Sequence, residues 1–229
     1  MHNLEIPQNI SFTGIHHALC ILQPVRIHPA LEKLIGGKPI HELNFFSLSR
    51  FQQILLLKSR KHLLAANPRS AMYMLTTAHN FLEGKAPSAS IDLLIDPEFE
   101  KELPDFIKKW PQNIWVGNKI PDALHTEIRN KKYDGIFLLY TDAIGLGWRK
   151  IEGQLSPAVS DKKVWVINGR RRIFLYNNDA RFTLGLRRFL DISCIVEILL
   201  ILGIITVAII TAAYDLFTHG KSKIREESP

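Results

Sequence analysis

The sequence predicts a mixed α/β fold: a Rossmann-like, mostly parallel sheet with helices on both faces, a helical N-terminal part and a single C-terminal transmembrane helix. From residue 91 onward, short apolar runs alternate with helical patterns, as they do in parallel sheets. Residues 192–213 then form an apolar run in which Glu197 is the one ionisable side chain. About 20 such residues are enough for a helix to cross a bilayer.

The composition is that of a globular protein, with 46% hydrophobic and 22% charged residues among 229. Cys20 and Cys194 are the two cysteines, and no C-x-x-C pair occurs, so we expect neither a disulfide framework nor a metal site. The net charge of +7 is compatible with nucleic acid, phosphate-bearing ligands or an anionic membrane. Nucleic-acid modules leave no signature. Beside a membrane helix, the lipid bilayer and its anionic headgroups are the partners that we expect.

Residues 1–90 are predicted to be the helix-rich N-terminal part of the domain. Its elements are a buried strand over 18–22 and helices over 29–35, 44–64 and 70–82.

Residues 91–180 are predicted to be the βαβ-type part. We expect strands over 91–96, 113–118, 133–140 and 163–167. The helices between them are predicted over 97–110, 121–132 and 147–155. Pro97 and Pro121 suit the start of their helices, whereas Pro104 is expected to kink or split the first one.

Polar residues stand at the carboxyl ends of these strands, where open parallel sheets bind ligands. They are Asp96, Asn118, Thr141, Asp142 and Asn168. One interpretation is a convergent ligand site. The other is that each residue caps the next helix or forms a turn, for which Asp, Asn and Thr are equally suited.

The loop after the strand over 133–140 contains Gly145 and Gly147, which would let the backbone approach a phosphate. The third glycine of the dinucleotide fingerprint is absent, so a tight turn explains this G-x-G equally well.

Asn168-Gly169 is typical of a type I′ hairpin turn, and we expect residues 170–176 to return as a strand. Arg170 and Arg172 would then share one face and be able to bind phosphate through their guanidinium groups. A solvated surface and contact with lipid headgroups are the alternatives.

Two functional hypotheses follow. The first is a transferase that uses a phosphate-bearing donor, such as a nucleotide sugar, at the membrane, with Asp142 as its base. The sequence does not identify a cofactor. The second is a non-enzymatic interaction module whose transmembrane helix pairs with a like or unlike helix. Small and polar residues that would make the helix contact are Glu197, Ala208, Thr211 and Ala212.

The orientation of the helix follows from the lack of a signal peptide. The first residues have no basic n-region and no apolar h-region. We therefore expect the domain to face the cytoplasm and the helix to carry the short polar tail, residues 214–229, across a membrane in a single pass. Motifs of P-loop proteins, α/β-hydrolases and zinc proteases are absent from the sequence.

Overall fold

The computed structural model describes most of the chain, which divides into two compact units, Met1–Leu184 and Gly185–Pro229. The described residues are 12, 14–23, 49, 53, 68–101, 103–130, 132–145, 148–155, 163–193 and 195–226. The helices predicted over 29–35 and 44–64 therefore lie outside them, apart from residues 49 and 53.

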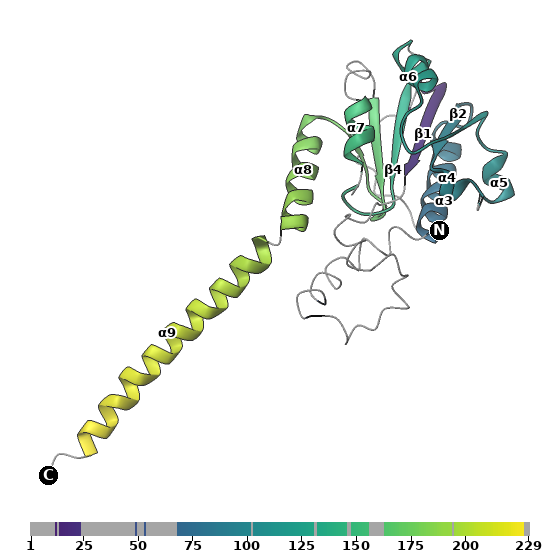
Figure 1. Cartoon of the computed structure of the whole chain (residues 1–229). Helices are drawn as coiled ribbons and strands as arrows, with labels where there is room; N and C mark the ends of the chain where they lie inside the picture. Colours follow the sequence, from purple (N-terminus) through teal and green to yellow (C-terminus); the bar gives the residue numbers. More distant parts are fainter. Residues whose placement is uncertain are drawn as a thin grey trace. The chain divides into compact units, whose positions relative to one another are not determined.

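A six-stranded sheet forms the first unit (Figure 1). Its strands are β1 (His17–Gln23), β2 (Ser90–Ile95), β3 (Asn113–Val116), β4 (Gly135–Tyr140), β5 (Lys163–Asn168) and β6 (Ile173–Leu175). They lie in the order β3-β2-β1-β4-β5-β6. β1 to β5 are parallel and β6 runs antiparallel to β5. The mixed α/β fold with a mostly parallel sheet is thus confirmed.

The direction in which strands are added reverses between β1 and β4. The chain builds β2 and then β3 on one side of β1, and afterwards returns to place β4 against the other side. In register, Ala18 of β1 lies between Ile91 of β2 and Gly135 of β4. All six residues of β4 are buried, which explains why its sequence is a continuous apolar run.

Helices cover both faces of the sheet (Figure 1). The helices of the described part of the chain are α3 (Pro68–Lys85), α4 (Pro97–Glu100), α5 (Asp105–Lys108), α6 (Asp122–Arg129), α7 (Arg149–Leu155), α8 (Asn178–Ser193) and α9 (Ile195–Glu226). Side chains of α3, α4 and α5 pack in one hydrophobic cluster. Those of α6 and α7 pack in a second cluster on the opposite face, together with Leu184 of α8.

Prolines set the boundaries of the helices that follow β2 and β3. Pro104 splits the predicted helix over 97–110 into α4 and α5, as expected from its missing N–H group. Pro121 has extended backbone angles and precedes α6 as its N-cap instead of lying inside the helix.

The hairpin between β5 and β6 is confirmed, but the predicted type I′ turn is wrong. The Arg171 N–H donates to the Asn168 carbonyl, 2.8 Å away, and Arg171, not Gly169, has a positive φ of 59°. This pattern is a three-residue loop in which a left-handed residue follows a type I turn. Arg170 and Arg171 thus lie in the turn, and the expectation that Arg170 shares a strand face with Arg172 is wrong.

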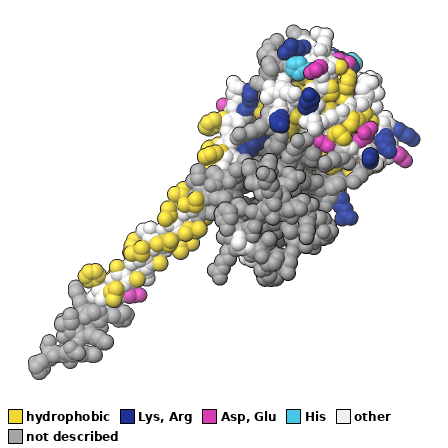
Figure 2. Space-filling model, viewed as in Figure 1, with side chains coloured by type: hydrophobic (Ala, Val, Ile, Leu, Met, Phe, Trp, Pro, Cys, Tyr) yellow, Lys and Arg dark blue, Asp and Glu magenta, His cyan; other side chains and the backbone are white. Residues whose placement is uncertain are grey.

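α9 belongs to the second unit. Its segment Ile198–Thr218 is long and apolar enough to cross a membrane, judged by length and composition. The large apolar side chains of this segment are exposed, and Figure 2 shows hydrophobic side chains along the face of the helix in view. The helix continues beyond the predicted residues 192–213 to Glu226.

Candidate functional site

The carboxyl ends of the parallel strands lie at one edge of the sheet, and the predicted polar residues are distributed along it. Thr141 and Asp142 follow β4, and Asn168 ends the neighbouring strand β5. Asp96 follows β2 and Asn118 lies just beyond β3, on the other side of β1.

Two loops pack closely at the ends of β4 and β5. The Gly169 N–H donates to the Asp142 carbonyl oxygen at 2.9 Å. The Asn168 Nδ2 atom donates to the Ala143 carbonyl oxygen at 3.2 Å. Thr141, Asp142 and Asn168 are therefore brought together, as the sequence predicts.

Asn168 and Asp142 both organise backbone in this region. The Asn168 Oδ1 atom accepts hydrogen bonds from the N–H groups of Arg170 and Arg172, each at 3.1 Å, and so shapes the hairpin turn. The Asp142 Oδ1 atom accepts the Gly145 N–H at 2.5 Å and shapes the loop after β4. Both side chains are at least nine-tenths buried. Asp142 and Asn168 therefore both form turns, which is one of the two roles expected from the sequence.

Gly145 is explained by packing against Tyr140. Its φ is +67°, and a Cβ atom there would lie 2.4 Å from the Tyr140 ring. Tyr140 in turn packs on Trp148, with ring centroids 4.7 Å apart, and donates a hydrogen bond to the Glu152 carboxylate. Gly147 lies outside the described residues, and α7 has only seven residues. Gly145 is therefore accounted for without a ligand.

The Thr141 hydroxyl is different. The side chain is 7% exposed, and its Oγ1 atom has no hydrogen-bond partner in the described part of the chain. A buried hydroxyl that lacks a partner costs about 1–3 kcal/mol. The other such atoms among these residues are indole nitrogens, none of which follows a strand: Trp115, Trp148 and Trp165. Thr141 is therefore the polar group at this edge that most needs a ligand or a water.

The remaining predicted residues lie apart from Thr141. Because β1 separates β2 from β4, strand spacing puts Asp96 about 10 Å from Thr141, and Asn118 is one strand further. Asp96 is buried and its carbonyl oxygen accepts the Phe99 N–H at 3.0 Å, as expected at the start of α4. Asn118 is exposed.

Gln23 is a residue of this edge that sequence reasoning missed. It ends β1, beside the reversal of strand order, is 6% exposed, and donates from Nε2 to the Gly117 carbonyl oxygen at 2.9 Å. A polar residue at the end of the apolar run 18–22 was the available signal.

The arginines of the hairpin turn differ in their contacts. Arg170 and Arg172 are exposed. Arg171 lies over the Tyr73 ring of α3, with its guanidinium carbon 5.4 Å from the ring centroid, and donates a hydrogen bond to the Tyr73 hydroxyl. Arg171 therefore ties the turn to α3, and Arg170 and Arg172 project from it.

A second polar cluster, also missed, lies at the amino end of the sheet. The Tyr133 hydroxyl donates to the buried Asp92 carboxylate at 2.7 Å and lies 3.0 Å from the Glu127 carboxylate. Lys132 pairs with both acids. Burial, followed by the two carboxylates, raises the pKa of Tyr133. The hydrogen bond from Lys132 to Glu127 is the main reason that the pKa of the ammonium is raised.

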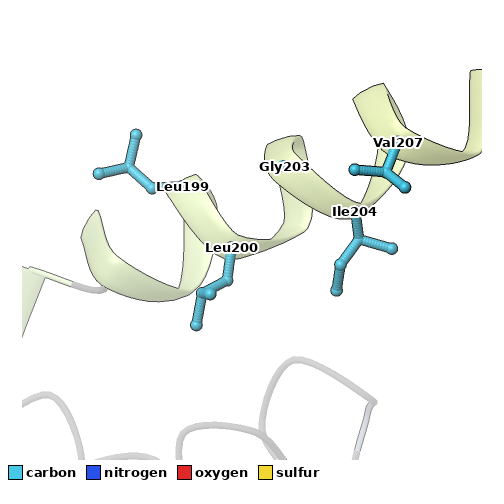
Figure 3. Close-up of a pocket in the computed structure, with 5 residues that line it drawn as sticks. All are labelled: Leu199, Leu200, Gly203, Ile204 and Val207. Atoms are coloured by element: carbon cyan, nitrogen blue, oxygen red, sulfur yellow. The ribbon is translucent and has the colours of Figure 1, made fainter. Parts of the chain in front are cut away.

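The predicted helix contacts lie along α9. Ala208, Thr211 and Ala212 are exposed, and the Thr211 hydroxyl donates to the Val207 carbonyl oxygen of its own helix at 2.9 Å. The side chain of Glu197 is outside the described part of the chain. A shallow hollow along α9 is lined by Gly203 and by apolar side chains, which Figure 3 shows: Leu199, Leu200, Ile204 and Val207.

Among the described residues, no three His, Cys, Asp or Glu side chains gather as a metal site would require. Comparisons of the chain with models of protein families, with curated proteins and with solved structures found no match.

Proposed function

We propose that this chain is a single-pass membrane protein whose first unit faces the cytoplasm and binds a phosphate-bearing, nucleotide-like ligand. The proposed site is the carboxyl edge of a Rossmann-like sheet. The reversal of strand order between β1 and β4 supports the location, because ligands of open α/β sheets bind at such switch points. The observation that carries the proposal is the buried Thr141 hydroxyl at the end of β4, which has no hydrogen-bond partner among the residues that the structure describes.

Group transfer to an acceptor in the membrane is the activity that this arrangement favours. Arg170 and Arg172 are exposed next to Asn168 and supply the charge that phosphates need. Asp142 follows Thr141 and is the proposed base or ligand of a donor hydroxyl. The apolar helix α9 would keep the domain close to a lipid-linked acceptor.

The ligand is tested with the full chain in detergent micelles. UDP-glucose, GDP-mannose and inorganic phosphate are added separately while thermal unfolding is followed. A ligand at 100 times its Kd stabilises the folded state by about 2.7 kcal/mol. Thr141→Val should abolish the shift and leave the unliganded protein folded. If none of the three probes shifts the melting temperature, the nucleotide-like ligand is wrong.

Asp142→Asn separates catalysis from folding. The amide oxygen of asparagine still accepts the Gly145 N–H, so the loop should persist. We expect ligand binding to remain and transfer to be lost. Retention of transfer activity by Asp142→Asn would remove Asp142 as the base.

A non-enzymatic role in membrane assembly is the second candidate. The exposed α9 segment and the hollow at Gly203 favour it, because glycine lets a facing helix approach closely. Gly203→Leu should weaken self-association of the chain in a membrane two-hybrid assay, whereas Ile198→Leu, outside the hollow, should not. Equal association of both variants with the unchanged chain would exclude pairing through this hollow.

A further inference from the structure

α8, in which the boundary between the two units falls, exposes large apolar side chains. Phe182 is 74%, Leu186 48% and Phe189 54% exposed. Steps of four and three residues put all three on one face of a helix. Figure 2 shows hydrophobic side chains at the surface over this helix. We refer to these three residues as the apolar stripe of α8.

The helix meets the core through a different face. Leu184, two residues from both Phe182 and Leu186, is 4% exposed and packs in the hydrophobic cluster of α6 and α7. At about 100° per residue, Leu184 lies roughly opposite the stripe. The stripe is therefore additional to the face by which α8 is attached.

Exposed arginines flank the stripe on the helical wheel. Arg181 lies on one side and Arg187 on the other, about 110° and about 130° from the middle of the stripe. An apolar face bordered by cations is the pattern of helices that lie in the boundary between lipid headgroups and acyl chains.

The position of α8 in the chain identifies the surface that covers the stripe. α8 ends at Ser193 and α9 begins at Ile195, so one residue separates the two helices. The C-terminal end of α8 therefore lies where the membrane span meets the headgroups. Exposed apolar side chains continue along α9 from Ile198.

We propose that α8 is an interfacial arm of the membrane anchor. Phe182, Leu186 and Phe189 enter the boundary of the bilayer, and Arg181 and Arg187 contact anionic headgroups. This inference rests on the proposed function only in that α9 must span a membrane. It is independent of any ligand at the sheet.

Spin labels on the full chain, reconstituted in lipid vesicles, test the arm. The background variant is Cys194→Ser; Cys20 is fully buried, and burial raises the pKa of its thiol, so it stays unlabelled. Single cysteines are then placed at Leu186→Cys on the stripe, at Thr183→Cys off it, and at Ile204→Cys in α9. Vesicles contain phosphatidylcholine alone or with phosphatidylglycerol. Collisions with oxygen, which enters lipid, are compared with those of a water-soluble nickel chelate.

The expected result is that the label at 186 collides mainly with oxygen and the label at 183 mainly with the nickel chelate. Phosphatidylglycerol should strengthen the contrast, and Arg181→Gln with Arg187→Gln should cancel that gain. If the label at 186 collides with the chelate as often as the label at 183, while the label at 204 is in lipid, α8 does not lie in the bilayer boundary. The proposal that α9 spans the membrane would then be retained. If the label at 186 is shielded from both reagents, protein covers the stripe and the arm is again refuted. A label at 204 that meets the chelate overturns the anchor itself.

Discussion

Gly169 lies against the main chain of Thr141, so closely that a Cβ atom on Gly169 would be 2.6 Å from the Thr141 carbonyl oxygen. The contact joins the β5–β6 turn to the loop after β4, and it explains this glycine without a left-handed backbone. Gly169→Ala must displace backbone, so we expect a loss of about 1–3 kcal/mol of stability. Chemical denaturation measures it.

Gly153→Ala is the matched control for that change. A Cβ atom at Gly153, inside α7, would meet no atom of the described residues within 4 Å. Alanine is a better helix former than glycine, so this variant should gain about 0.5–1 kcal/mol. Equal effects of the two substitutions would contradict the packing of the two loops.

Thr141→Val should stabilise the unliganded protein. The substitution removes a buried hydroxyl that has no partner in the described part of the chain and keeps the shape of the side chain. We expect a gain of about 1 kcal/mol in the free energy of unfolding. Thr126→Val, whose hydroxyl donates to the Asp122 carbonyl oxygen at 2.9 Å, should bring no gain. A destabilised Thr141→Val would mean that a bound water already satisfies the hydroxyl.

Tyr133→Phe should destabilise the amino end of the sheet. It deprives the Asp92 carboxylate, which is 3% exposed, of a hydrogen bond of 2.7 Å. The expected cost is about 1–3 kcal/mol in chemical denaturation. Glu127→Gln changes a side chain that is 33% exposed and should cost about 0.5 kcal/mol or less. If Tyr133→Phe and Glu127→Gln lost equal stability, the loss in Tyr133→Phe could not be attributed to the burial of Asp92.

Asp134 makes stability depend on pH. Burial raises its pKa, but the N–H groups of His16 and His17 donate to its carboxylate and the net pKa is lowered. A lowered pKa stabilises the fold above the unfolded value of about 3.9, and this contribution is lost as pH falls through the folded value. The difference in unfolding free energy between the unchanged chain and Asp134→Asn should therefore narrow below about pH 4. Asp122→Asn, which also removes one negative charge, controls for net charge; a difference that stays constant with pH would contradict the assignment.

Strand positions could be predicted because burial on both sides of a parallel sheet demands uninterrupted apolar runs, as in β4. Helix boundaries followed from Pro104 and Pro121, since proline has no N–H to donate. Strand order was not predictable, because the pairing of β1 with β4 joins residues that are far apart in the chain. The apolar pattern of each strand is the same whichever neighbour it has.

The candidate site was predicted only in part. The convergence of Thr141, Asp142 and Asn168 follows from the parallel strands, which end at one edge. The pattern does not reveal which hydroxyl lacks a partner or that Gly145 packs on Tyr140, because both depend on neighbours that are distant in sequence or on loop geometry. The Asp92 cluster was missed for the same reason: its partners come from different elements.

Because β1 lies between β2 and β4, it is synthesised long before both of its neighbouring strands exist. β1 acquires one neighbour when β2 is made and the second only when β4 is made. The Asp134 carboxylate accepts a hydrogen bond from the N–H of His16, just before β1 and 118 residues away in the chain. Sheets built from such distant pairings fold slowly, since a long loop must close before the contacts form. Until β4 is made, the edge of β1 that it will occupy exposes unpaired backbone groups that other strands can bind. The interval between β1 and β4 is therefore when the chain is most prone to aggregation and most dependent on chaperones.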